Sequence, residues 1–64
     1  MDLREARFKK RITQWSLSKI ANVHQSRISL IENGYVNPNR EERKRIAKAL
    51  DYRIAEIFPD NVAN

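Results

Sequence analysis

The sequence contains no cysteine, and its single histidine has no second Cys/His-type ligand beside it. Disulfide bonds and a Cys/His metal site are therefore excluded, and the lack of cysteine is typical of a reducing compartment. No apolar run approaches the ~20 residues that a membrane span needs, and no signal-peptide pattern stands at the N-terminus. We therefore expect a soluble cytoplasmic protein without metal, cofactor or small-molecule ligand.

The sequence also lacks a constellation of catalytic groups. His24 stands at a predicted helix start, and no cysteine or pair of carboxylates lies near it to complete a triad. A histidine at such a position is far more often structural than catalytic. We therefore predict that the chain is not an enzyme.

A strand pattern, a linker and an internal repeat are all missing from the 64 residues. This predicts one small all-α domain of five short helices. A domain of this size buries only about 60% of the surface that its unfolded chain exposes, so its stability is marginal. Local helix signals and a compact core must hold the fold together, because no disulfide or metal can do so.

Positive charge is in excess, since 13 Lys and Arg residues against 8 Asp and Glu give a net charge of +5. This balance favours a polyanionic partner, although basic residues also keep many small proteins soluble. The distribution is more informative than the sum, because the cations flank one central segment. They are Arg4, Arg7, Lys9, Lys10 and Arg11 before it, and Arg40, Arg43, Lys44 and Arg45 after it.

The central segment, residues 13–34, predicts two short helices joined by a tight turn. Thr13 is a good N-cap, and Ile12 and Leu17 hold the two positions of a hydrophobic staple. These signals predict a helix over 14–21.

A second helix start follows 11 residues later, with Val23 and Ile28 in the staple positions and His24 at the cap. The chain must therefore turn sharply at Asn22, a residue type that tolerates the left-handed conformation. The second helix is predicted over 25–32.

The outer face of this second helix is polar without being rich in Glu or Lys. Ile28 and Ile31 should point inward, and Gly34 should end the helix in the left-handed conformation. The outward side chains are then Gln25, Ser26, Ser29 and Leu30. Such a face suits the major groove of DNA, where Gln can bond adenine, Ser is adaptable and an aliphatic group can contact a thymine methyl.

The N-terminal helix is expected from residue 3 to about 10, where Asp2 and Glu5 can act as a capping box. The domain is expected to span 1–59. Residues 60–64 should form a frayed tail.

The C-terminal part of the domain predicts a loop and two helices. The loop, 35–39, contains a proline and leads to a helix over 40–50 that begins with a capping box of Asn39 and Glu42. A last short helix, 54–58, is stopped by the proline that follows it.

Trp15 is the residue of the central segment whose packing and role are hardest to predict. On the predicted helix it points away from the side of Leu17, so we expect it to be only partly buried. Packing against the first helix or the C-terminal segment is the favoured interpretation. The alternative is a contact with the sugar-phosphate backbone of DNA or with a partner subunit.

The central segment reads TQxxLxxxAxVxQSRISLIENG and is followed by a proline-containing loop and RIAKALDYRIAEIF. This pattern resembles the lambda-repressor/Cro-type (XRE-like) helix-turn-helix family of DNA-binding domains, over about Leu3 to Phe58. Asn22 stands where the family usually has glycine, and Ser18 where it usually has alanine; both changes are mild. The resemblance implies a compact five-helix lambda-repressor-like fold.

The resemblance also implies roles for the matching positions. Base edges would be read by Gln25, Ser26, Ser29 and Leu30. Phosphates and backbone would be contacted by Gln14, Arg27, Asn33, Asn37, Asn39 and Arg40. Gln14 would also brace Gln25. Arg7 and Glu32 would form an internal ion pair.

We therefore predict sequence-specific binding of double-stranded DNA by a nucleoid-associated transcriptional regulator. One recognition helix covers few base pairs, which favours a homodimer on a pseudo-palindromic operator with half-sites about one turn apart. The candidate dimer surfaces are the loop after Gly34 and the segment 52–58. A protein-interaction module of antitoxin or coactivator type is a second interpretation, which the Gln-Ser-Arg-Ser surface disfavours. A DNA-targeting domain of a larger enzyme is a third.

Overall fold

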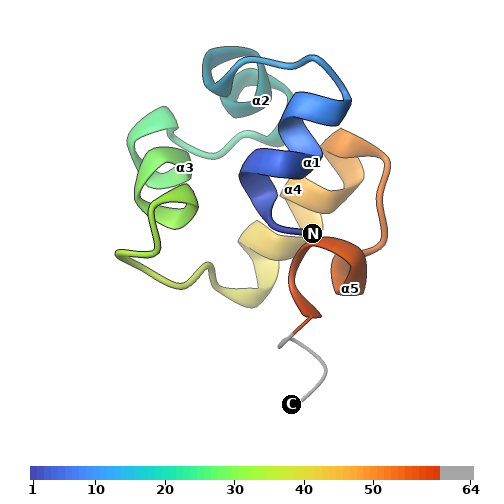
Figure 1. The fold of residues 1–64 in the computed structure, drawn as a ribbon. Coiled ribbons are helices and arrows are strands. Elements are labelled where there is room, and N and C mark those ends of the chain that lie inside the picture. The colour runs from blue at the N-terminus through green and yellow to red at the C-terminus, as the bar shows by residue number, and fades with distance from the viewer. Residues whose placement is uncertain (60–64) are drawn as a thin grey trace.

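The computed structural model describes residues 1–59, which form five α-helices and, within that range, no strand. They are α1 (Leu3–Lys9), α2 (Gln14–Ala21), α3 (Gln25–Glu32), α4 (Arg40–Leu50) and α5 (Ile54–Ile57) (Figure 1). The predicted all-α fold is confirmed. The tail predicted over 60–64 lies outside the described residues.

Side-chain caps begin the helices on which the site depends. Thr13 Oγ1 accepts a hydrogen bond from the Ser16 N–H at 3.0 Å, which satisfies one free donor at the start of α2. At the start of α4, Asn39 Oδ1 accepts from the Glu42 N–H, and Glu42 Oε1 accepts from the Asn39 N–H at 2.9 Å. The predicted capping box of α4 is therefore confirmed.

Two local predictions were wrong in detail. Asp2 accepts from the Glu5 N–H at 2.8 Å, but within the described residues the Glu5 side chain does not return the bond, so α1 has a cap rather than a box. His24 does occupy the predicted N-cap position of α3, although its side chain makes no cap bond there. The last helix stops before Phe58 because the proline after it disfavours the helical conformation at that residue.

A left-handed residue follows each of the first four helices. These residues are Arg11, Asn22, Gly34 and Asp51, with φ between 57° and 78°. In each case the next residue donates its N–H to the carbonyl five residues earlier, as Val23 does to Ser18 at 3.3 Å and Tyr35 to Leu30 at 3.0 Å. This backbone motif satisfies the free carbonyls of the helix ends and sets the angle at which the chain leaves.

Arg11→Gly is expected to stabilise the fold by about 0.5–1 kcal/mol. Arg11 has φ 57°, where a Cβ is strained, and the removed strain outweighs the greater freedom of glycine in the unfolded chain. Urea unfolding followed by circular dichroism measures the change. Lys44→Gly, which removes the same charge from an exposed helical position of α4, should destabilise instead; equal effects of the two variants would show that Arg11 is not strained.

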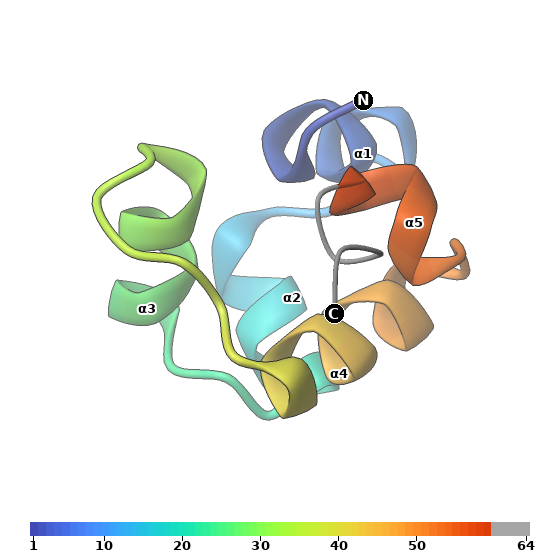
Figure 2. The ribbon, with the colours of Figure 1, turned by 90° about the horizontal axis from the view of Figure 1, so that it is seen from below.

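The helices pack around a core whose fully buried centre is made of Leu17, Ile28, Ile46 and Leu50. Helix α2 packs on both α3 and α4, α1 contacts α3, and α5 packs on α4. Figures 1 and 2 both place α3 at one side of the molecule and α5 at the other. One face of α3 therefore stays uncovered by the rest of the fold.

Candidate nucleic-acid interface

The uncovered face of α3 carries the side chains that the sequence predicted there. Ile28 and Ile31 point into the core, whereas Gln25 and Ser26 are exposed, Leu30 is 38% exposed and Ser29 is half-buried. Within residues 1–59 no hydrogen bond or ion pair engages the side chains of Gln25 and Ser26. An amide and a hydroxyl are thus free to bond to an external partner.

The C-terminal end of α3 is held by Glu32, whose side chain is fully buried. Its Oε2 accepts from Arg7 Nε at 2.6 Å, and its Oε1 accepts from Arg7 Nη2 at 3.2 Å. Gln14 Nε2 donates to the same Oε1 at 3.0 Å, and Arg4 Nε approaches it at 3.4 Å. One carboxylate therefore joins α1, α2 and α3, and fixes how α3 lies against the rest of the domain.

The hydrogen-bond partner of the Gln14 side chain differs from the predicted one. The amide was expected to brace Gln25, but its nitrogen donates to Glu32 instead. The second Nε2 proton and the Oε1 atom of Gln14 remain available, and the side chain is partly exposed. The amide is thereby oriented at the start of α2, next to the exposed side of α3.

The pKa of Glu32 lies below its usual value of 4.5. Burial opposes ionisation of this carboxyl, but hydrogen bonds from Arg7 and Gln14 and the charge of Arg7 together outweigh burial. Between the lowered pKa and 4.5, the unfolded chain binds a proton that the folded chain does not. The stability from this carboxylate is therefore complete above pH 4.5 and is lost as the pH falls through the folded pKa.

Thermal unfolding measured as a function of pH tests this linkage. The midpoint should fall as the pH is lowered below about 4.5, the usual glutamate value. Glu32→Gln should weaken that dependence, whatever its effect at neutral pH, because it removes one carboxyl with a lowered pKa, while Glu42, whose pKa is also lowered, still titrates. Glu5→Gln, at an exposed carboxylate of α1, should keep the wild-type slope, and an unaltered slope in Glu32→Gln would contradict the assignment.

Asn33, at the end of α3, is held in place by two hydrogen bonds. Its Nδ2 donates to the Ser29 carbonyl, and its Oδ1 accepts from Arg4 Nη2, each at 2.9 Å. From the sequence, Arg4 was predicted only to belong to the basic cluster, and this contact was not predicted. The available signal was its spacing, because Arg4 lies one helical turn before Arg7 and so shares its side of α1.

Arg27 was predicted to contact the DNA backbone, and in the structure it forms an ion pair between α3 and α4. Its Nε and Nη2 donate to the two oxygens of Glu42 at 2.9 and 2.7 Å. The hydrogen bond from Arg27 lowers the pKa of the Glu42 carboxyl. The Glu42 carboxylate neutralises the charge of Arg27. Unpaired positive charge near α3 therefore comes from the residues that flank this helix.

The loop between α3 and α4 presents the remaining predicted contacts. Asn37, Asn39 and Arg40 are exposed, and Asn39 uses its side-chain Oδ1 atom to cap α4. Arg43 folds back and donates from Nη1 to the Pro38 carbonyl at 2.7 Å, which fastens the loop to α4. The loop thus lies between α3 and the start of α4 (Figure 2).

No group of three or more His, Cys, Asp or Glu side chains suited to hold a metal occurs within residues 1–59. In the same part of the chain, no helix has the length and apolar character that crossing a membrane requires.

The family comparison yields one match. A family model described as helix-turn-helix matches residues 3–57. Comparisons with individual curated proteins and with solved structures found no match. The matched range covers all five helices and includes the pair α2 and α3.

Proposed function

Because this chain belongs to the helix-turn-helix family of the lambda-repressor type, a DNA-binding family, we propose that it recognises a specific sequence of duplex DNA as a transcriptional regulator. The observation that supports this most is the outer face of α3. Its exposed amide and hydroxyl have no partner within the described residues, while both flanks of the helix are fastened by ion pairs. A rigid helix with free short polar groups is suited to reading base edges.

In the proposed mechanism α3 enters the major groove. Gln25 bonds N6 and N7 of an adenine, Ser26 and Ser29 bond neighbouring edges, and Leu30 contacts a thymine methyl. Occupancy of the site by the protein then controls transcription, because it blocks or recruits other proteins there.

Groups around α3 are proposed to hold the phosphates and set the register. The ends of the motif supply the amides of Gln14 and Asn33, and the loop and α4 supply Asn37, Asn39 and Arg40. Arg27 keeps Nη1 for this purpose, since only Nε and Nη2 bond to Glu42. Lys and Arg that neutralise phosphates release counterions, so affinity should fall with salt.

We also propose that the protein binds as a homodimer, because one helix reads few base pairs. The loop after Gly34 is the better candidate surface, since Tyr35 is 76% exposed. In the segment 52–58, Ile57 is buried in the core and Tyr52, Ile54 and Phe58 are partly buried against it, which leaves less of that segment for a partner.

Selection of bound duplexes from a random pool tests the function directly. We expect enrichment of two related half-sites with centres about 10 base pairs apart and two-fold symmetry. Repeating the selection at higher salt separates base reading from purely electrostatic binding. A pool that stays random under both conditions would reject sequence-specific binding and favour a protein-interaction module.

A further inference from the structure

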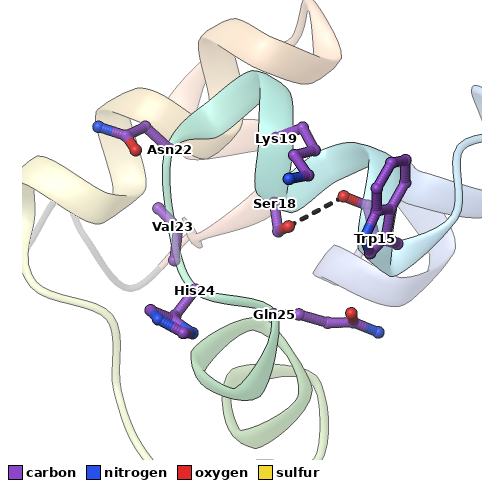
Figure 3. A pocket seen from close by; sticks show the side chains of 7 residues that line it. All are labelled: Trp15, Ser18, Lys19, Asn22, Val23, His24 and Gln25. Atoms are coloured by element: carbon purple, nitrogen blue, oxygen red, sulfur yellow. Dashed lines mark hydrogen bonds between the residues drawn. The ribbon is translucent and has the colours of Figure 1, made fainter.

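Trp15 is a large aromatic residue that lies exposed in the first turn of α2. It is 58% exposed, which confirms the prediction that it is only partly buried. Packing against α1 or the C-terminal segment, the favoured interpretation, would leave most of the ring uncovered. It follows Gln14 directly and projects from the first turn of α2. There it lines an open hollow of about 500 Å³ between α2 and the start of α3 (Figure 3).

The hollow is lined by a cationic side chain, an aromatic ring and several polar groups. The Lys19 ammonium lies 5.0 Å from the centre of the Trp15 ring. The other lining residues are Ser18, Asn22, Val23, His24 and Gln25. None of the seven carries a carboxylate, so the hollow has positive charge, hydrogen-bonding groups and one flat apolar surface. These groups together suit an anion that is attached to a compact apolar group.

The position of the hollow relates it to base reading. Gln25 lines the hollow and is also the first residue of the exposed face of α3. In Figure 3 its side chain extends from α3 toward the side on which Trp15 lies. Trp15, Lys19 and Gln25 thus line the same hollow, beside the exposed face of α3.

We propose that Trp15 and Lys19 bind the sugar-phosphate backbone of the DNA that flanks the bases read by α3. The Lys19 ammonium binds a phosphate, and the indole packs on the adjoining deoxyribose with its N–H free to donate to a phosphate oxygen. The assignment rests on the proposed function of the chain and extends its interface beyond α3. A protein partner fits less well, because the hollow adjoins Gln25 and has a charge complementary to phosphate.

The chain has one tryptophan and two tyrosines, so fluorescence excited at wavelengths that tyrosine does not absorb reports on the surroundings of Trp15 alone. The intact protein is titrated with the selected duplex, with and without about one turn (~10 base pairs) of flanking sequence on each side. We expect the emission of Trp15 to change on the flanked duplex, in parallel with binding measured by anisotropy. On the trimmed duplex binding should persist and the emission change should be lost.

Lys19→Gln provides the second measurement. It should make the slope of log affinity against log salt concentration shallower by about 0.9. Over a fourfold rise in salt, the variant should therefore lose roughly 3.5-fold less affinity than the unaltered protein. Lys48→Gln removes the same charge from the groove between α4 and α5 and should keep the wild-type slope. Trp15→Ala should weaken binding to the flanked duplex and leave the trimmed one unaffected, and Trp15→Tyr should restore part of the loss.

Three outcomes would overturn the assignment. The first is an emission that DNA leaves unchanged while the duplex still binds. The second is the same salt slope in Lys19→Gln and Lys48→Gln. The third is an emission that varies with protein concentration without DNA, which would place a second copy of the chain on the hollow. Each leaves the proposed function intact, whereas equal binding of selected and random duplexes by the unaltered protein would reject that function itself.

Discussion

Arg7→Ala is expected to lower the free energy of unfolding by about 3–5 kcal/mol, because it leaves a buried carboxylate without its main partner. Arg7 is 9% exposed, and the side chain of Glu32 has no exposed surface. The same guanidinium also donates to the Ile12 carbonyl at 2.9 Å, so that bond is lost as well. Chemical unfolding followed by circular dichroism measures the difference.

The size of this effect is large for such a small domain. A stability of roughly 0.05–0.15 kcal/mol per residue corresponds to about 3–10 kcal/mol for a chain of this length. The expected loss is therefore between about a third of this stability and all of it, so the thermal midpoint should fall sharply. Loss of DNA binding in Arg7→Ala would follow from unfolding and would say nothing about contact with DNA.

Arg4→Ala is the matched control, because Arg4 approaches the same carboxylate from the surface. Its side chain is 47% exposed and its Nε lies 3.4 Å from Glu32 Oε1, so its removal should cost no more than about 1 kcal/mol. Arg7→Met combined with Glu32→Met should be less destabilised than Arg7→Ala, because no buried charge is left unpaired. Equal midpoints for Arg7→Ala and Arg4→Ala would show that burial does not distinguish the two arginines.

Gln25→Ala is expected to reduce discrimination between the selected site and random DNA by about 1–3 kcal/mol. The exposed amide makes no bond within the described residues, so its removal should not alter the fold. The loss should concentrate on the base pair that the amide reads, while binding to random duplex stays the same. Competition binding with duplexes substituted at single positions measures it.

Arg40→Ala is the contrasting variant. Arg40 is exposed at the start of α4 and is proposed to contact phosphate, so its loss should weaken all sequences together and reduce the salt slope. If Gln25→Ala instead weakened specific and random duplexes equally, its base-reading role would be rejected.

The sequence predicted most of the helix boundaries, because the signals that set them are local. A threonine cap, an asparagine in the turn and a glycine after α3 each act on backbone groups within a few residues. Where such a signal was misjudged, the reason was also local, as with Phe58 before its proline. The inward positions of Ile28 and Ile31 follow from helical periodicity in the same way.

The partners of the long polar side chains could not be predicted from such signals. Arg27 bonds Glu42, and Gln14 bonds Glu32, across 15 and 18 residues of sequence. An arginine at this position of α3 has the same local pattern whether its partner is a phosphate or a carboxylate of another helix. Only the packing of α3 against its neighbours brings the competing carboxylate within reach.

The sequence by itself thus determined where the helices begin and end and which face of each is apolar, since both depend on short-range hydrogen bonding and periodicity. The tertiary structure decided which charges are already neutralised before any partner arrives, and which stay free. It joined three helices on Glu32, paired Arg27, and left Trp15 and Lys19 beside Gln25. These outcomes depend on distances between helices, which are set by how the whole core packs.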